Sequence, residues 1–380
     1  MTRPAGKWLS EERDAYLLGL MRCLLGVLLC IQVWQRFEEV VTWGYFGSVF
    51  HLPLLVPEAW VPSESVYRWL LGIQGAGAVL AAVGWFGREG LFAGSGIGLF
   101  LMLCDRLQFH NNRFALLLCC FLCAFCPSDR SFLLYRGKRH ALPLEQRLAP
   151  TLPRRLIQFQ VSLLYLSSGG GKLLDPDWRG GQTMLLRFQK GMEEAQRQGL
   201  TPPHWLADFL TSPLVVSLGS KAAISLELCL ALTLWFSRTR VAALWFGTLF
   251  HVFIQASVHV ELFSFLMGVA YVAFVTPELR ERTLVVDVRT RVGRVTKTLV
   301  RALDWLARFR IEERPSVAPE DRVVVLERGG ERLTARAVPA ALARALPAGF
   351  LIWPLLALFA TRRPRVVVTD STAGSEAGPG

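Results

Sequence analysis

The sequence predicts an all-α polytopic membrane protein with about eight transmembrane helices, both termini in the cytoplasm and a small cytoplasmic α/β tail at the C-terminus. Three observations predict this fold class. Hydrophobic residues make up 52% of the 380 residues and charged residues only 19%, which is too apolar a balance for an ordinary soluble domain. Apolar stretches recur at about the 20-residue length that a helix needs to cross a bilayer. The basic residues gather in alternate connections between these stretches.

The candidate transmembrane helices follow one another through the first part of the chain. They lie near residues 16–34, 67–86, 91–108, 114–127, 156–171, 213–236, 240–258 and 260–276. The fourth is short for a span, so we expect it to extend into its flanking residues.

The net charge of +12 has two explanations. One is nucleic-acid binding, and the other is a membrane protein whose basic loops stay in the cytoplasm. With eight spans, five basic regions fall on one side of the membrane: the N-terminal residues up to Arg13, the turn at Arg88, loop 128–155, the link 237–240 and the segment after Pro277. This agreement favours the membrane explanation. We therefore expect membrane lipids as partners, and no nucleic acid.

The chain divides into a transmembrane domain, 1–277, and a tail, 278–370, followed by residues 371–380, which are disordered by composition. The tail begins with a basic amphipathic helix over 287–310. This helix either lies on the anionic inner leaflet or packs on a small domain of its own. Two β-prone runs around Gly329-Gly330 then predict a hairpin, and an alanine-rich helix follows.

Cysteines at positions 120, 123 and 126 recur every three residues, a spacing that would suit a soft metal. No cation or polar partner lies nearby in the sequence to stabilise thiolates, so we interpret them as packing residues of a membrane helix. We predict no metal site.

Polar residues gather on the non-cytoplasmic side of the predicted topology. Four outer connections bring together His51, Asp105, His110, Asn111, Asn112, Lys172, Asp175, Asp177, Trp178, His259 and Glu261. Polar groups at a membrane edge are costly unless they are solvated, paired or used. We therefore expect a functional site there, with Lys172, His110 and Asp177 in one cavity.

Each of these residues also has a structural explanation. Asp175 and Asp177 are typical caps of a following helix, Trp178 is typical of an interfacial anchor, and Lys172 could reach the membrane surface along its aliphatic stem. The run Gly169-Gly170-Gly171 favours a close approach of this helix to a ligand or to another helix.

At these residues the chain resembles the vitamin K-dependent γ-carboxylase superfamily, and in particular its bacterial branch, the HTTM (horizontally transferred transmembrane) family. The carboxylase pattern Gly-x-Lys-Lys-Leu-Asp-x-Asp-Trp is similar to residues 170–178, and Asn-Asn-His-x-Tyr-Leu is similar to residues 111–116. The helix from His251 to Phe274 is similar to the last core helix of the family. The resemblance covers roughly residues 10–280.

The resemblance implies a multi-helix membrane enzyme in a bacterial cytoplasmic (inner) membrane, with a site that opens to the outer face and a quinone-type substrate or cofactor. It implies catalytic roles for Lys172 and His110. The implied substrate-binding residues are Asn111, Asn112, Asp175, Asp177, Trp178 and His259. The lysine that acts as the base in carboxylases aligns with Leu173, and the family's histidine aligns with Arg113. We therefore predict that the protein does not carry out authentic vitamin K-dependent carboxylation.

Three functional hypotheses remain open at this point. The first is an enzyme that acts on a lipophilic or quinone-type substrate from the outer face. The second is a non-catalytic membrane protein that binds a lipid or another lipophilic small molecule. A transporter is the least favoured, because no inverted repeat is visible and few charges lie within the apolar segments.

Overall fold

The computed structural model describes residues 11–42, 44–46, 52–137, 141–258, 261–275, 279–327 and 330–360. The chain separates into two compact units, Met1–Pro277 and Glu278–Gly380. We describe each unit by itself.

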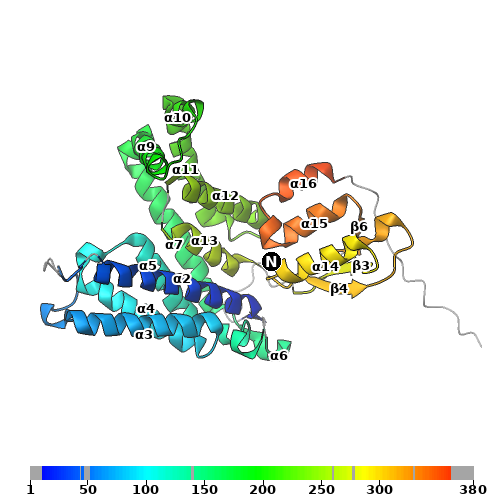
Figure 1. Cartoon of the computed structure of the whole chain (residues 1–380), viewed down its shortest axis with the longest axis horizontal. Helices are drawn as coiled ribbons and strands as arrows, with labels where there is room; N and C mark the ends of the chain where they lie inside the picture. Colours follow the sequence, from blue (N-terminus) through cyan, green and yellow to red (C-terminus); the bar gives the residue numbers. More distant parts are fainter. Residues whose placement is uncertain are drawn as a thin grey trace, which may run out of the picture. The chain divides into compact units, whose positions relative to one another are not determined.

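The first half of unit 1 is a bundle of four helices, drawn from blue to cyan in Figure 1. They are α2 (Tyr16–Thr42), α3 (Glu64–Val83), α4 (Gly87–Cys104) and α5 (Asn111–Ala124). Helix α2 packs against the other three. A Cβ atom on Gly90 would lie 2.4 Å from the backbone oxygen of Gly77, so these two glycines let α3 and α4 pack backbone against backbone.

The second half of unit 1 is built around α7 and α11, which pack side by side. Its helices are α7 (Leu152–Leu174), α8 (Pro176–Gly180), α9 (Gln182–Arg197), α10 (His204–Thr211), α11 (Pro213–Thr233), α12 (Arg240–Val258) and α13 (Phe263–Ala270), which continues as η5 (Tyr271–Phe274). Buried Val161, Leu230, Leu234 and Met267 form the core between them. The short helices α8–α10 carry the chain from the end of α7 to the start of α11.

Short elements join these helices. They are β1 (Glu12–Asp14), η1 (Glu58–Trp60), η2 (Arg106–Gln108), η3 (Ser128–Arg130), η4 (Leu134–Arg136), α6 (Leu144–Arg147) and β2 (Leu148–Pro150). Strands β1 and β2 pair antiparallel. Arg147 also forms an ion pair of 2.8 Å with Asp14, so the start of α2 is fixed to the start of α7.

Every segment that the sequence marked as a candidate span overlaps a helix. By length and composition, three of the described helices could cross a membrane: α2, α3 and α11, with mean hydropathies of 2.0, 1.4 and 1.6. Asn111–Ala124 and Phe263–Phe274 are shorter apolar helical stretches. That all eight segments cross the bilayer, with both termini inside, stays a prediction.

Unit 2 is a four-stranded sheet with helices, drawn from yellow to red in Figure 1. The strands are β3 (Arg282–Val286), β4 (Phe309–Glu313), β5 (Val323–Leu326) and β6 (Arg332–Thr334), in the order β4-β3-β5-β6. Only β3 and β4 are parallel, and α14 (Arg291–Leu303) connects them. The other elements are η6 (Pro319–Asp321), α15 (Ala337–Ala345), η7 (Pro347–Gly349) and α16 (Trp353–Phe359).

The basic helix of unit 2 is shorter than the sequence indicated. It ends at Leu303 instead of Arg310, because the carboxylate of Asp304 accepts hydrogen bonds from the backbone N–H groups of Arg308 and Phe309, at 2.8 and 3.0 Å. These bonds form a turn that leads into β4. Val300 of the helix packs with Leu284 and Val325 of the sheet, so α14 belongs to a small domain of its own. Strands β5 and β6 lie antiparallel on either side of the Gly329-Gly330 position.

Candidate functional site

A cavity of about 1340 Å³ lies in unit 1, between α5 of the first half and the helices of the second half. Its walls are mostly apolar, with aromatic rings from five different segments of the chain: Phe114, Phe188, Phe209, Phe250, Phe253 and Phe263. A few polar side chains interrupt these walls, among them Lys172 and Glu227. A largely apolar cavity with a small number of convergent polar groups is typical of a site for a small molecule.

Lys172 and Glu227 form an ion pair in the wall of this cavity. The Lys172 Nζ lies 2.5 and 2.6 Å from the two carboxylate oxygens of Glu227, and it also donates to Ser168 Oγ at 2.9 Å. The side chains are 18% and 6% exposed. Since two buried charges are tolerated only when they are paired and hydrogen-bonded, the pair explains how an acid can lie in the middle of the apolar helix α11.

Trp178 forms part of the same wall and faces two cations. The Lys172 Nζ lies 5.0 Å from the centre of the Trp178 ring, and the guanidinium carbon of Arg187 lies 5.4 Å from it. Both distances are in the range of cation–π contacts. Asp175 fixes this geometry, because it ends α7 and caps α8 by accepting a hydrogen bond from the N–H of Asp177 at 2.9 Å.

The glycine run has one member that the packing requires. A Cβ on Gly169 would lie 3.0 Å from Leu228 Cγ and 3.2 Å from Glu227 Cβ. Gly169 therefore lets α7 and α11 approach closely enough for Lys172 to reach Glu227. At Gly170 and Gly171 no atom lies within 4 Å of an added Cβ, so neither needs to be glycine for packing.

A second polar group lies behind the ion pair, in the core of unit 1. Tyr165 Oη lies 2.7 Å from His251 Nε2 and is also hydrogen-bonded to the hydroxyl of Tyr271. His251 is buried, and its Nδ1 has no hydrogen-bond partner in the part of the chain that the structure describes. Tyr165, Ser168 and Lys172 are spaced three and four residues apart on α7, so they lie along one face of this helix.

The implied substrate-binding residues fall into three groups, and Lys172 belongs to the first. Lys172, Trp178, Asn111 and Asn112 all line the cavity. Asp175 and Asp177 do not line it, and they form the start of α8. His259 lies outside the described residues.

His110 was expected in the same cavity as Lys172 and Asp177, but neither His110 nor Asp177 is among the residues that line the cavity at Lys172. His110 does not line the cavity, and its Nδ1 lies 3.8 Å from Glu261 Oε2. Next to it, Arg113 pairs with Glu39 of α2 at 2.5 Å. Arg36 also contacts Glu39, at 2.7 Å. This ionic group holds the start of α5 against α2, and the residues of α5 that line the cavity are Asn111, Asn112, Phe114 and Leu118.

Glu227, Tyr165, His251 and Tyr271 were missed as site residues in the sequence reasoning. Glu227 had a signal, because an ionisable residue within an apolar segment is a candidate for function. The two tyrosines had none, since aromatic residues are common in apolar helices. His251 was named only as the first residue of the helix that resembles the last core helix of the family.

The cysteines of α5, and Cys126 just after it, belong to the core of the bundle. Cys119, Cys120, Cys123 and Cys126 are buried together with Met21, Leu25 and neighbouring residues. Among the residues that the structure describes, no three His, Cys, Asp or Glu side chains gather as a metal site would require.

Comparison with known proteins gives one match. The model of the family described as the HTTM domain matches residues 11–278. No curated protein and no solved structure matches the chain. The matched range contains every residue that lines the cavity and stops at the start of unit 2.

Proposed function

Because the chain belongs to the HTTM domain family, we propose that its membrane unit binds a lipophilic, quinone-type molecule in the cavity beside Lys172. The Lys172–Glu227 pair then exchanges a proton with the head group of this molecule. The observation that carries the proposal is a partly buried ion pair in the wall of a mostly apolar cavity. The family resemblance supports a bacterial cytoplasmic membrane as the location and the outer face as the side of entry.

The dimensions and lining of the cavity support a lipophilic ligand. A volume of about 1340 Å³ exceeds the roughly 300–1,000 Å³ of ordinary small-molecule pockets, so a ring and part of an attached chain could be enclosed. Phe188, Phe250 and Phe263 offer flat apolar contacts for a ring. The side-chain amides of Asn111 and Asn112 offer hydrogen bonds to a ring oxygen at some distance from Lys172.

The ion pair supports proton exchange without a change in the net charge of the site. A head-group hydroxyl that enters beside the pair gives its proton to the carboxylate of Glu227. The ammonium of Lys172 then donates a hydrogen bond to the oxygen anion that remains. The site holds one positive and one negative charge before and after this transfer. His110 does not line the cavity, so we assign it no part in the transfer.

The ion pair also supports the second hypothesis, in which the protein binds a lipophilic molecule without any chemistry. In that case Lys172 would act as an anchor for a polar head group, and the acyl chain of a lipid would fill the apolar part of the cavity. Binding and proton exchange can be separated by experiment.

The test compares the wild-type protein with the double variant Lys172→Met/Glu227→Gln in lipid nanodiscs. The double variant removes both charges, so it leaves no unpaired buried ion. Equilibrium dialysis measures the affinity for a short-chain naphthoquinone and for its reduced form. We expect the reduced form to bind about tenfold more weakly to the double variant, a loss of about 1.4 kcal/mol. Lys221→Met is the matched control, because Lys221 is an exposed lysine of α11 that does not line the cavity.

The absorption spectrum of the bound reduced form tests the proton exchange. An aryl oxygen anion absorbs at longer wavelength than the corresponding hydroxyl, so wild-type protein should shift the absorption and the double variant should not. Equal affinities and equal spectra for the two proteins would refute the proposal. Binding without a spectral shift would leave the binding function and remove the chemistry.

A further inference from the structure

Helix α14 of unit 2 presents a row of apolar side chains to the outside. Val292, Val295 and Leu299 are 54%, 49% and 52% exposed. Their spacing of three and four residues places them in one stripe along the helix. Isolated exposed apolar residues are ordinary on protein surfaces, whereas a continuous stripe indicates a surface that something else covers.

The stripe is not the face that packs on the sheet of unit 2. Gly293 and Val300 are the buried residues of this helix, and they lie roughly 100° away around the helix axis from the stripe. Helix α14 therefore has two apolar faces. Gly293 and Val300 form a small one that packs on its own domain, and the stripe forms a second one that points away from this domain.

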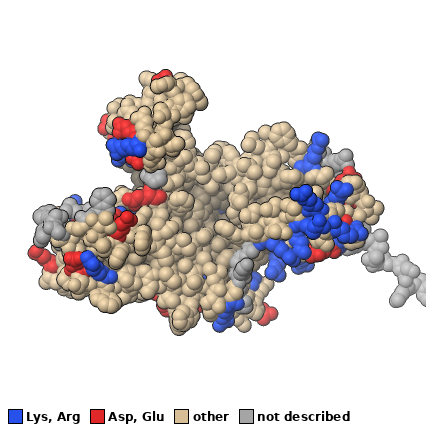
Figure 2. All heavy atoms as spheres, in the orientation of Figure 1, with Lys and Arg blue, Asp and Glu red and all other residues tan. Residues whose placement is uncertain are grey.

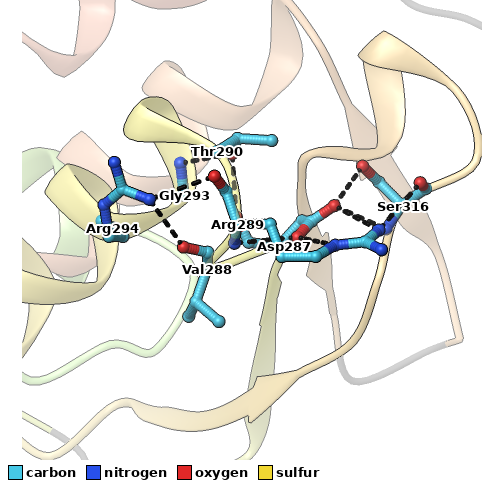
Figure 3. Close-up of polar contacts among 7 residues, drawn as sticks. All are labelled: Asp287, Val288, Arg289, Thr290, Gly293, Arg294 and Ser316. Carbon is cyan, nitrogen blue, oxygen red and sulfur yellow. Dashed lines mark hydrogen bonds and ion pairs between the residues drawn. The ribbon is translucent and has the colours of Figure 1, made fainter.

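The contacts at the start of α14 fix this rotation (Figure 3). A Cβ on Gly293 would lie 2.1 Å from the backbone oxygen of Asp287, so the Gly293 face of the helix packs directly against the backbone of Asp287. Thr290 Oγ1 donates to the same oxygen at 2.8 Å and accepts from the N–H of Gly293 at 3.1 Å. The carboxylate of Asp287 is held in turn by the N–H and hydroxyl of Ser316, at 2.8 and 2.7 Å. The helix therefore cannot turn to bury its stripe.

One arginine borders the stripe and a second lies on the next face of the helix: at about 100° per residue, Arg291 is about 40° from Val295, and Arg294 is about 100° from it. Arg291 and Arg294 are exposed, and neither forms an ion pair with another residue that the structure describes. The guanidinium of Arg294 donates to the backbone oxygens of Val288 and Arg289, at 3.1 and 3.0 Å, which holds this charge beside the first turn (Figure 3). Figure 2 shows lysine and arginine gathered over the part of unit 2 that contains α14 and its sheet.

In the predicted topology, in which residues 260–276 cross the bilayer, chain connectivity keeps this surface near the membrane. Unit 2 follows the apolar stretch Phe263–Phe274, and β3 begins at Arg282. Seven residues of fully extended chain, 275–281, span at most about 25 Å. Because this short tether makes docking of unit 2 on the membrane an intramolecular event, even a weak interaction between α14 and the lipids would be formed most of the time.

We propose that unit 2 docks on the anionic phospholipid surface of the membrane through α14, with the apolar stripe among the lipid head groups, Arg291 on the phosphates and the charge of Arg294 adding to the attraction. An exposed apolar stripe bordered by an arginine, with further positive charge on the next face, is the pattern of a helix that lies in the plane of a membrane interface. A nucleic acid would use the arginines and leave the valines and the leucine without a role.

The test uses the full chain in nanodiscs with an environment-sensitive fluorophore on a single cysteine. The labelled background replaces Cys229, Cys23 and Cys30 by alanine, because these are the native cysteines that are not fully buried. One label replaces Val295 in the stripe. The control label replaces Val317, which is fully exposed in a loop of the same unit.

We expect nitroxide lipids to quench the label at residue 295 several-fold more in discs with one-third phosphatidylglycerol than in discs of phosphatidylcholine alone. The label at residue 317 should be quenched equally weakly in both. Arg291→Gln/Arg294→Gln should bring the quenching at residue 295 down to the phosphatidylcholine level. Arg322→Gln, an exposed arginine of unit 2 outside α14, should leave it unchanged.

Two results would overturn the proposal. One is equal quenching at residue 295 in anionic and neutral discs, or no quenching in either. The other is lipid quenching of a label at Leu358 of α16, which is also exposed, in place of quenching at residue 295.

Discussion

Arg22 is a fully buried charge whose hydrogen-bond acceptors are backbone oxygens. It donates to Ser128 O at 3.0 Å, Ser131 O at 3.1 Å and Phe132 O at 2.8 Å, and also to Ala81 O. These bonds join α2 to the end of α3 and to the loop that follows α5. A single side chain therefore satisfies several buried carbonyl groups, and we interpret it as a structural clamp of the bundle.

Replacing Arg22 tests this role. Arg22→Met would leave its acceptors buried and unsatisfied, each at a cost of about 1–3 kcal/mol, so we expect a loss of about 3 kcal/mol or more. Unfolding in a titration from mild detergent to dodecyl sulfate measures it. Arg68→Met is the control, because Arg68 pairs with Glu64 on the surface of α3 and should contribute less than about 1 kcal/mol. Equal losses in the two variants would contradict the clamp.

Asp287 makes the stability of unit 2 sensitive to acid. Hydrogen bonds from Arg289 and from Ser316 hold the pKa of its carboxyl well below the ordinary value of 3.8. Since the folded pKa is lowered, the stabilisation is fully present above the ordinary value and is lost as pH falls below it, through the folded pKa. We expect Asp287→Asn to lower the melting temperature at pH 7 and to do so progressively less below about pH 3.8.

The full chain is heated at several pH values, and unfolding of unit 2 is detected by proteolysis within that unit. The measured quantity is the difference in melting temperature between Asp287→Asn and the wild type. Glu312→Gln serves as the control, because Glu312 pairs with Arg314 at the surface and its loss should have little effect at any pH. A constant difference between Asp287→Asn and wild type from pH 7 down to pH 2.5 would rule out the proposed origin of the acid sensitivity.

At the scale of elements, the packing of α7 on α11 determines the geometry of the site. Gly169→Leu would force these helices apart, because Leu228 and Glu227 already occupy the space around residue 169. We expect a stability loss of about 1–3 kcal/mol and weaker quinone binding, since Lys172 and Glu227 would move apart. Gly170→Leu is a matched control on the same run, because its added side chain meets no neighbouring atom within 4 Å at Cβ. Similar effects of the two changes on dodecyl sulfate unfolding would refute this account.

The sequence was informative about elements wherever apolar length or local chemistry defines them. Helices lie at every candidate span because an apolar run of this length has few other stable forms in a membrane. Strand β3 was missed, since the run Arg282–Val286 is stabilised by pairing with β4 and β5, which are distant in sequence. In the site, the Lys172 block was recognisable as a motif. Its partner Glu227 lies 55 positions away, and only the packing of α7 on α11 brings it close.

At the scale of the whole molecule, the distribution of basic residues makes a prediction about sidedness. Loop 128–155 should lie in the cytoplasm and segment 168–212 on the outer side. Cysteines introduced at Arg136 and at Thr201, which are both exposed, should react with a membrane-impermeant thiol reagent from opposite faces of sealed vesicles. Reaction of both from the same face would contradict the eight-span topology.

The family relationship raises the question of whether this chain carboxylates glutamate, and we predict that it does not. Leu173 stands where the resemblance places the catalytic base, and its side chain has no proton acceptor. It is 47% exposed and does not line the cavity. Neighbouring residues of a helix point about 100° apart, so Lys172 cannot take the place of Leu173 without a shift of the backbone. Lys172 is also paired with Glu227 as an ammonium ion, which has no lone pair to accept a proton.

The assay supplies the reconstituted protein with reduced vitamin K, labelled bicarbonate and a glutamate peptide. We expect no label in the peptide from the wild type or from Glu227→Gln, in which the ionic partner of Lys172 is removed. Incorporation by the wild type that disappears in Lys172→Ala would show that Lys172 is the base and that the prediction is wrong. Incorporation of label by Glu227→Gln but not by the wild type would show that the ion pair with Glu227 prevents Lys172 from acting as the base. In that case Leu173 would not be the reason for the lost activity, because the neighbouring lysine could act once it is released from the carboxylate.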